Sequence, residues 1–237
     1  MSGAEGQLAG QLALVTGASR GIGAATARAL AAAGAHVVLV AREAKALEAV
    51  EEQIHQAGGQ ATIAPMDLAE PDSIARLATA IAGRWRALDV LVNAAAHFPP
   101  LMGVADADGK IMAKTMTVNS LAVHSLIHAF HPMLKRSANA RVIQLTTTVA
   151  ETPRAWWGAY GASKAAADAL LTAYAEEVKN TSAIRVALVN PGATRTKMRA
   201  EAYPGEDPAT VKDPRVVADR LLALLSEPFT SPHRERL

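Results

Sequence analysis

The 237-residue sequence contains no cysteine. Disulfide bonds, thiolate nucleophiles and cysteine-ligated metal sites are therefore excluded, and the absence is compatible with a reducing compartment. Aromatic residues make up only 4% of the chain, whereas 50% of the residues are hydrophobic. We therefore expect a core built mainly from alanine, valine, leucine and isoleucine.

The sequence also lacks a strong excess of charge and long apolar runs. Lys and Arg number 24 against 22 Asp and Glu, a balance that does not favour a nucleic-acid partner. No apolar run approaches the ~18 residues that a membrane span needs. Residues 1–10 lack the basic and apolar regions of a signal peptide. We expect a soluble cytoplasmic protein without a nucleic-acid or membrane partner.

Short apolar runs alternate with longer helical patterns along the chain. The runs are apolar throughout, which is typical of strands covered on both faces. This alternation predicts an α/β fold with a doubly wound parallel sheet of six strands (a Rossmann fold) in a single domain, residues 1–237. The expected strands are residues 12–16, 36–41, 60–65, 89–92, 141–146 and 184–190. The expected helices are residues 22–33, 43–56, 72–84, 112–135, 159–179 and 214–226.

A glycine-rich turn, TGASRGIG at residues 16–23, joins the first expected strand to the first helix. Glycines let the backbone approach a pyrophosphate, and the helix N-terminus offers unpaired N–H groups. An ordinary strand-to-helix turn also favours glycine, but this one opens the first βαβ unit. We expect a dinucleotide to contact Gly17, Ser19, Arg20, Gly21, Ile22 and Gly23.

The end of the second strand indicates which dinucleotide binds. An NAD-binding protein usually carries an acidic residue there, but this chain has Ala41 followed by Arg42. Arg42, with Arg20 in the turn, can pair with a 2′-phosphate. The alternative is that Arg42 starts a helix in solvent. We predict NADP(H) as the cofactor, with NAD(H) as the less favoured choice.

Tyr160 and Lys164 lie four residues apart at the start of an expected helix, so both project from one face. Acid–base work at neutral pH requires the tyrosine pKa to fall from about 10 to about 7, or roughly 4 kcal/mol of phenolate stabilisation. A lysine ammonium one turn away, aided by the positive nicotinamide ring of an oxidised cofactor, is suited to supply it. The alternative is a solvent-exposed helical pair.

Two further polar residues complete the expected hydride-transfer site. Thr147 follows a buried strand, and its hydroxyl can hold the reacting oxygen, although threonines also suit a strand end on propensity. Asn119 falls inside an expected helix, where asparagine is unfavourable, and binding a proton-relay water is one reason for it. We predict Asn119, Thr147, Tyr160 and Lys164 as the catalytic residues.

Together these residues resemble the short-chain dehydrogenase/reductase family, in particular single-domain NADP(H)-type bacterial reductases. The motifs are TGASRGIG (16–23), DL (67–68), DVLVNAAA (89–96), VN (118–119), YGASK (160–164) and NPGATRT (190–196). The resemblance implies that Tyr160 is the acid/base, that Lys164 modifies its pKa and binds the ribose, and that Asn119 is a relay. It implies further cofactor contacts from Asp67, Leu68, Asn93, Ala94, Pro191, Gly192, Thr194 and Thr196.

The chain departs from the family pattern at three places. Thr147 replaces the catalytic serine and adds a methyl group with restricted χ1. The usual Asn-Asn-Ala-Gly reads NAAA at residues 93–96. No glycine-rich seventh strand follows the last expected helix, so we expect that strand to be missing or truncated. Because it often contributes to subunit contacts, the expectation of a homodimer or homotetramer is weakened.

Several other residues have a structural and a functional interpretation. Three histidines form one stripe of the Asn119 helix, but no carboxylate accompanies them, so we favour a polar surface and expect no metal. Two long connections, residues 97–111 and 192–213, follow strand ends where such sheets bind ligands. The histidines are His124, His128 and His131, and the expected pocket residues are His97, Phe98, Trp156, Trp157, Met198 and Tyr203.

The leading hypothesis is an NADPH-dependent carbonyl reductase acting on a modest, partly apolar small molecule. Reduction of an imine or a double bond on the same scaffold is a further possibility. The alternative, from a different functional class, is a non-catalytic protein that binds NADP(H) and acts as a sensor or binds a partner. The serine-to-threonine change and the missing strand would favour this alternative. Retention of Asn119, Tyr160 and Lys164 together favours the enzyme.

Overall fold

The computed structural model describes residues 6–237. All its strands are parallel and form one sheet with the order β3-β2-β1-β4-β5-β6-β7. The chain therefore reverses its direction of growth between β1 and β4, where such sheets open a ligand crevice. The strands are β1 (Leu12–Thr16), β2 (His36–Ala41), β3 (Gln60–Pro65), β4 (Val90–Asn93), β5 (Arg141–Leu145), β6 (Arg185–Asn190) and β7 (His233–Arg236).

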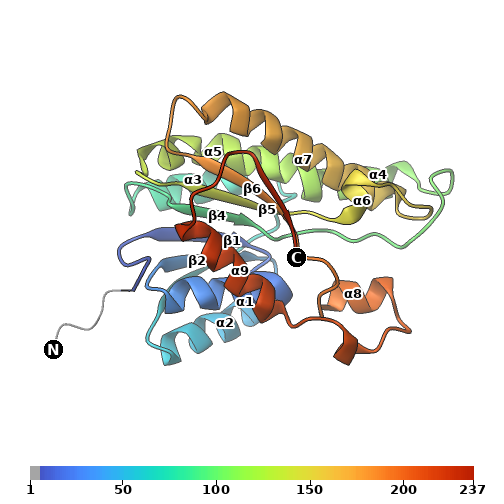
Figure 1. The fold of residues 1–237 in the computed structure, drawn as a ribbon, viewed down its shortest axis with the longest axis horizontal. Coiled ribbons are helices and arrows are strands. Elements are labelled where there is room, and N and C mark those ends of the chain that lie inside the picture. The colour runs from blue at the N-terminus through green and yellow to red at the C-terminus, as the bar shows by residue number, and fades with distance from the viewer. Residues whose placement is uncertain (1–5) are drawn as a thin grey trace.

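Helices cover both faces of the sheet (Figure 1), with α1, α2 and α9 on one face and α3, α5 and α7 on the other. Within residues 6–237, none of them is both long and apolar enough to span a bilayer. The helices are α1 (Gly21–Ala32), α2 (Ala44–Gln56), α3 (Ser73–Ala82), α4 (Gly109–Met116), η1 (Thr117–Leu121), α5 (Ala122–Arg136), α6 (Thr148–Glu151), α7 (Gly158–Val178), α8 (Lys197–Ala202), η2 (Pro208–Thr210) and α9 (Pro214–Ser226).

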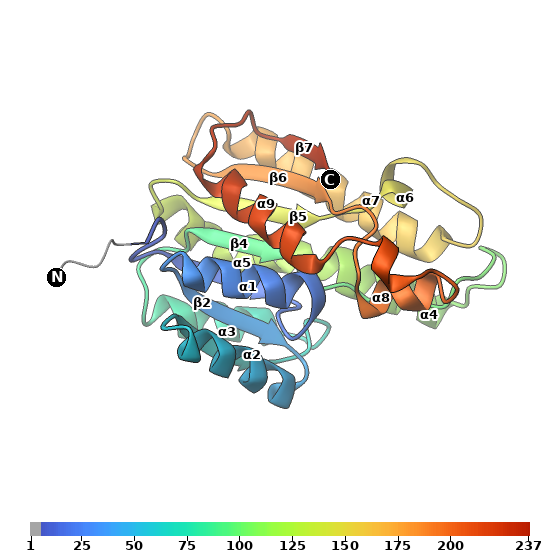
Figure 2. The same ribbon diagram turned by 60° about the horizontal axis from the view of Figure 1, so that its bottom comes forward.

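Two apolar clusters, one on each face of the sheet, form the core. Alternate residues of each strand enter opposite clusters: Leu14 packs toward α5 and α7, whereas Val15 packs toward α1 and α9. The all-apolar strands predicted from the sequence follow from this two-sided burial. Figure 2 shows that α4 and α8 lie beyond the arrowheads of the strands, at the edge where the crevice opens.

The prediction of six strands is wrong, because β7 pairs in parallel with β6 from Ala187 opposite His233 to Asn190 opposite Arg236. This strand is four residues long, reads HRER, and is only partly buried. It therefore carries no apolar signal and is defined by long-range pairing alone. The prediction of one uninterrupted helix over residues 112–135 also differs from the structure, where the π-helical turn η1 separates α4 from α5.

A bidentate ion pair fixes β7 to the body of the protein. Arg220 of α9 donates from Nε and Nη2 to the two carboxylate oxygens of Glu235, at 2.6 and 3.1 Å. The Glu235 side chain is 20% exposed, so solvent screens the pair less than it would on the open surface. The hydrogen bonds from Arg220 lower the pKa of Glu235 below its usual value.

We predict that Glu235→Gln lowers the free energy of unfolding by about 1 kcal/mol at pH 7, or about 2–4 °C in Tm. Because the folded-state pKa is lowered, this stability is present above the unfolded pKa of about 4.3 and is lost as the pH falls through the folded pKa. Thermal unfolding at several pH values measures both effects. Glu201→Gln is the control, since its pair with Lys197 is exposed and 3.9 Å long; equal losses in the two variants would contradict the prediction.

Candidate active site

A groove of about 1460 Å³ lies along the carboxyl ends of the strands. The glycine turn after β1 forms one part of it, and residues at or after the ends of β2, β3, β4, β5 and β6 form others, together with residues of α1 and α2. Helix α8 and the start of α9 also contribute. Of the residues predicted to bind the cofactor, those lining the groove are Gly17, Ser19, Arg20, Gly21, Ile22, Gly23, Arg42, Asp67, Leu68, Ala94, Tyr160, Lys164, Pro191 and Thr196.

The glycine turn has the close backbone approaches that require glycine. Gly17 adopts φ 66°, and a Cβ there would lie 2.8 Å from the amide nitrogen of Ala95. A Cβ at Gly23 would overlap the carbonyl oxygen of Gly17. The turn therefore lies flat against the loop after β4 and leads directly into the N-terminus of α1, where backbone N–H groups are free to bind an anion.

The groove beyond the turn combines exposed cations with an acidic residue. Arg20 and Arg42 are exposed, and neither forms an ion pair in the described part of the chain. Arg42 follows β2 directly. Asp67, on the other side, accepts a hydrogen bond from the backbone of Ala69 at 2.9 Å. This arrangement offers two positive groups to a phosphate; the residue directly after β2 is a cation, and Glu43, the N-cap residue of α2, lines the groove next to it.

Tyr160 and Lys164 of α7 both line the groove, although they are only 8% and 2% exposed. Burial lowers the pKa of Lys164 to about 8, and the nearby Asp168 carboxylate opposes this effect. Burial raises the pKa of Tyr160 to about 12, and Asp168 raises it further. In the protein alone, burial and the Asp168 charge both raise the pKa of the phenol, whereas the lowering predicted from the sequence also includes the positive charge of an oxidised nicotinamide. The phenol is a protonated hydrogen-bond donor at neutral pH.

Asn119 lies in the π-helical turn and is fully buried. Its Oδ1 accepts from the backbone N–H of His97 at 2.7 Å, and its Nδ2 donates to the His97 carbonyl at 2.9 Å. Nδ2 also donates to Ser163 Oγ at 2.9 Å. The side chain thus joins the loop after β4 to α7 directly beside Lys164. Both Nδ2 hydrogens are therefore used, and Oδ1 retains one acceptor site.

The threonines after β5 are placed differently from the prediction. Thr146, rather than Thr147, lines the groove, and its Oγ1 donates to Asp168 at 2.5 Å. Thr147 lies at the N-cap position of α6 and is partly buried. Its hydroxyl makes no hydrogen bond within residues 6–237 and so retains both donor and acceptor capacity.

Aromatic side chains surround the Tyr160 ring. Phe98 and Trp157 have ring centroids 5.3 and 6.2 Å from it, and Tyr203 lies 5.9 Å from Trp157. Met198 of α8 covers the phenol, with its sulfur 3.7 Å from the hydroxyl oxygen. The sequence predicted these four residues as pocket or lid candidates; the structure brings Phe98, Trp157 and Met198 to Tyr160, and Tyr203 to Trp157.

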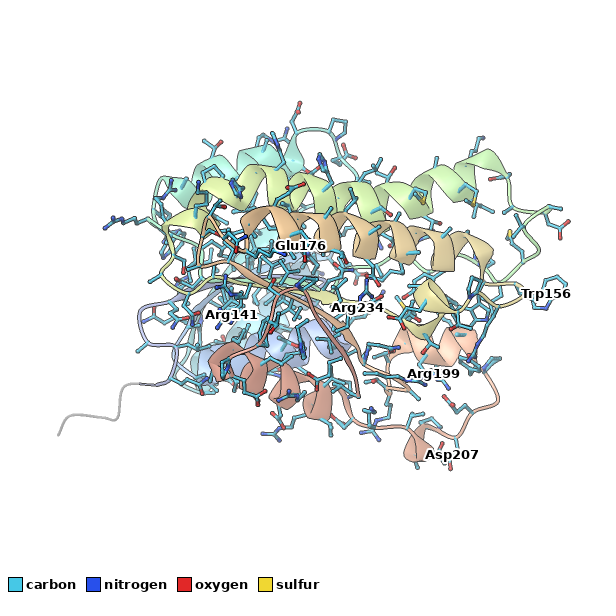
Figure 3. The ribbon with its side chains drawn as sticks, turned by 45° about the horizontal axis from the view of Figure 1, so that its top comes forward. Arg141, Trp156, Glu176, Arg199, Asp207 and Arg234 are labelled. Atoms are coloured by element: carbon cyan, nitrogen blue, oxygen red, sulfur yellow. The ribbon has the colours of Figure 1, made fainter. Side chains whose placement is uncertain are left out.

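Trp156 is placed apart from this group. It is 62% exposed and projects from the rim of the molecule (Figure 3), with φ 72°, a conformation that tryptophan rarely adopts. His97 lines the groove. Its burial, and then the charges of Lys114 and Arg42, lower the pKa of its imidazole.

Three predicted cofactor residues do not line the groove. Asn93 is 2% exposed, and neither of its side-chain polar atoms has a partner in the described residues. Thr194 is 3% exposed and donates to the Pro191 carbonyl at 3.1 Å. Gly192 adopts φ 62° and packs against the backbone of Leu237. Thr194 and Gly192 therefore stabilise the β6–α8 connection through these contacts and do not line the groove.

The histidine stripe of α5 lies away from the groove. The rings of His124 and His128 are 6.2 Å apart, and both residues are exposed. His131 Nδ1 lies 2.9 Å from the hydroxyl of Tyr174. No cluster of three or more potential metal ligands occurs among residues 6–237.

The sequence reasoning missed Asp168, a buried carboxylate one turn beyond Lys164. Its signal was present, because an acidic residue follows Tyr160 and Lys164 at the same spacing of four in an alanine-rich helix. Ser163, which accepts from Asn119, was also missed. It lies on the same buried side of the helix start.

Comparison with known proteins identifies similar chains over nearly the whole length. A sequence model of the family described as short chain dehydrogenase matches residues 11–207. The uncharacterized oxidoreductase YciK of Escherichia coli (strain K12) is 32% identical over 220 residues, which cover 92% of this chain and 86% of YciK.

Solved structures that are similar to this chain over nearly its whole length are also short chain dehydrogenases by description. A putative short chain dehydrogenase from Pseudomonas syringae is 37% identical, with a TM-score of 0.93 over 99% of this chain and 97% of that one. A putative short chain dehydrogenase from Escherichia coli CFT073, complexed with NADPH, is 31% identical. It has a TM-score of 0.92, with 99% of each chain covered.

We predict that Asn119→Ala lowers the free energy of unfolding by about 2–4 kcal/mol, since it leaves the partly buried backbone groups of His97 and the buried Ser163 hydroxyl without this partner. Urea unfolding measures the loss, and limited proteolysis should show cleavage after β4. Asn139→Ala is the matched control, because Asn139 is exposed. Equal stability of the two variants would show that the Asn119 side chain does not hold this loop.

Proposed function

The chain belongs to the short-chain dehydrogenase/reductase family of oxidoreductases, and from this premise we propose that it transfers hydride between NADP(H) and the carbonyl or alcohol carbon of a small, partly apolar molecule. The observation that carries the proposal is the common groove: the glycine turn and the Tyr160–Lys164 pair line the same cavity. A cofactor lying on the turn and extending along the strand ends would reach the phenol. One domain, residues 1–237, would then hold cofactor and catalytic groups together.

The residues present fit a dinucleotide. The approaches at Gly17 and Gly23 leave no room for side chains, and they present backbone N–H groups at the start of α1. Lys164 lines the groove from α7 and is placed to donate to ribose hydroxyls, and Asp67 and Leu68, which follow β3, line it as well. When bound, the nicotinamide would supply or accept the hydride.

The proposal of NADP(H) rather than NAD(H) is supported by Arg20 and Arg42. Both line the groove, both are exposed, and neither is committed to an ion pair in the described chain. A guanidinium can bind a 2′-phosphate through two parallel hydrogen bonds. The NADPH complex of the structurally similar Escherichia coli protein is consistent with this choice.

In the reductive direction, Tyr160 is the proposed proton donor to the carbonyl oxygen. Its phenol is fully protonated at neutral pH because burial raises its pKa to about 12. Lys164, whose pKa burial lowers to about 8, would stabilise the phenolate left behind while it stays charged. This contribution is present below pH 8 and is lost as the pH rises through that value.

Thr147 and Asn119 have supporting parts in this proposal. Thr147 does not line the groove itself, but its hydroxyl makes no cap hydrogen bond, and it is the proposed second ligand of the carbonyl oxygen once a substrate is bound. Asn119 has both side-chain groups engaged by His97 and Ser163. We therefore propose that its side chain fixes the loop and helix around Lys164 and that its π-helical backbone serves any relay of water.

The proposed substrate is partly apolar because the wall around Tyr160 is apolar. Phe98 and Trp157 contact the phenol ring, and Met198 covers its hydroxyl. A carbonyl compound must displace the Met198 thioether to accept the proton. We also propose a homodimer or homotetramer, supported by Leu121 and Leu170, which are 55% and 41% exposed.

Tyr160→Phe tests the acid. Loss of the proton donor should lower turnover by about 10²–10⁴-fold while NADPH affinity is retained. NADPH oxidation is followed with ketones, aldehydes, quinones, imines and activated double bonds, and binding is followed by NADPH fluorescence. Tyr174→Phe is the matched control on the same helix, because the Tyr174 hydroxyl contacts His131 instead. Near-normal turnover of Tyr160→Phe would remove Tyr160 from the mechanism, and NADPH binding without turnover in any form would favour the non-catalytic binding protein.

Arg42→Asp tests the cofactor preference. Removing the guanidinium and adding a carboxylate should lower kcat/KM for NADPH by about 10–100-fold relative to NADH. The ratio of the two values in steady-state assays is the measurement. Arg28→Asp makes the same change of charge at another groove residue, one that donates to Gln53. Unchanged selectivity in Arg42→Asp, or the same change in both variants, would contradict the assignment.

A further inference from the structure

Helix α7 carries Tyr160, Lys164 and Asp168 in three successive turns of one face. Asp168 is 4% exposed and is the one buried acidic residue within residues 6–237. The proposed chemistry uses the first two residues and gives Asp168 no part. A buried carboxylate is costly unless it is paired or hydrogen-bonded, so its contacts indicate what it does.

One carboxylate oxygen is held from two strands. Thr146, after β5, donates from Oγ1 to Asp168 Oδ2 at 2.5 Å, and Arg234 Nη1 of β7 lies 3.8 Å from the same oxygen. Arg234 is itself fixed, since Nη2 donates to Thr172 of α7 at 3.2 Å and Nη1 to Glu151 of α6 at 3.1 Å. Figure 3 shows Arg234 extending from the terminal strand beside α7.

The other oxygen is left unpaired. Asp168 Oδ1 is buried and has no hydrogen-bond partner in the described chain. No ion pair within 4.0 Å joins Asp168 to Lys164 there, although residues spaced by four lie about 5–6 Å apart at Cβ. The carboxylate therefore acts on the ammonium through space, across a poorly solvated gap where charges interact more strongly than in water.

Within residues 6–237, the pKa values of Lys164 and Asp168 depend on burial and on a few neighbouring groups. The Asp168 carboxylate raises the pKa of Lys164 against the effect of burial. Burial raises the pKa of Asp168 itself, while Thr146, Lys164 and Arg234 lower it and Glu151 raises it. Asp168 also raises the pKa of Tyr160. The carboxylate thus favours a charged lysine and a neutral phenol.

We propose that Asp168 is a positioning residue of the active site, whose carboxylate keeps the Lys164 ammonium charged at the groove and is itself held by Thr146 and by Arg234 of the last strand. The effect on catalysis rests on the proposed function. The coupling between the two charges is a property of the protein alone and can be measured without turnover.

The test is the titration of Lys164 in cofactor-free protein labelled with ¹³C at lysine Cε, with its NMR signal assigned by its loss in Lys164→Met. In the unsubstituted protein the midpoint should lie near 8. Asp168→Asn should move it to lower pH by about one unit. Asp168→Glu retains the charge and should restore most of the shift. Glu151→Gln is the control, because it removes the other carboxylate bound to Arg234, and it should leave the midpoint nearly unchanged.

The interaction between the two charges is reciprocal, so removing the Lys164 ammonium must also change the pKa of Asp168. In Lys164→Met, the Asp168 carboxyl signal should titrate at higher pH than in the unsubstituted protein, because Lys164 lowers its pKa. This measurement decides the matter if Asp168→Asn fails to fold. An unchanged Lys164 midpoint in folded Asp168→Asn, or an unchanged Asp168 midpoint in Lys164→Met, would overturn the proposal.

Turnover gives a separate readout. In the reductive direction the alkaline limb of the pH–rate profile should move to lower pH in Asp168→Asn, because Lys164 loses its proton earlier. For a shift of one pH unit, turnover at pH 8 falls about fivefold, whereas at pH 6 it is nearly unchanged. A change of rate that is equal at all pH values would indicate a structural role and would contradict the proposal. If no compound of the substrate panel supports NADPH oxidation, the proposed function fails. The titrations of Lys164 and Asp168 still decide whether the two charges are coupled.

Discussion

Placing the Lys164 ammonium almost fully inside the protein is the constraint on which the rest of the site depends. An amine in that position loses most of its hydration, so its charge must be supported by neighbours or given up. The carboxylate of Asp168 provides that support from one turn below, while the groove leaves the ammonium open to a ligand above. The neutral state of Tyr160 follows from the same two features, burial and a nearby negative charge.

The sheet makes this arrangement possible by collecting distant segments at one edge. Thr146 follows β5, Arg234 lies in β7 and Asp168 lies in α7, so three separate parts of the chain meet at the Asp168 carboxylate. Their relative positions are set by strand pairing and by packing of the apolar clusters on either face. The polar network is therefore a product of the whole fold rather than of any local motif.

The sequence predicted the first six strands and the glycine turn because burial on both faces leaves uninterrupted apolar runs, and because close backbone approach requires glycine. It could not predict β7, since a short polar edge strand is defined by its partner alone. The oddity of Asn119 inside a helix was visible, but its binding to the His97 backbone depends on a loop path that no pattern encodes. The raised pKa of Tyr160 in the protein alone could not be predicted from spacing, because the depth of burial that causes it depends on the whole fold.

The π-helical turn at residues 117–121 has a consequence for everything that follows it in the chain. Each residue advances an α-helix by about 100°, so the additional residue in a wide turn sets the rotation of the next segment. In α5 that rotation directs Val123, Leu126 and Phe130 into the core and leaves His124 and His128 on the outside. Deleting one residue from the turn would rotate this apolar stripe away from the sheet, so insertions and deletions there are far more restricted than substitutions on the outer face.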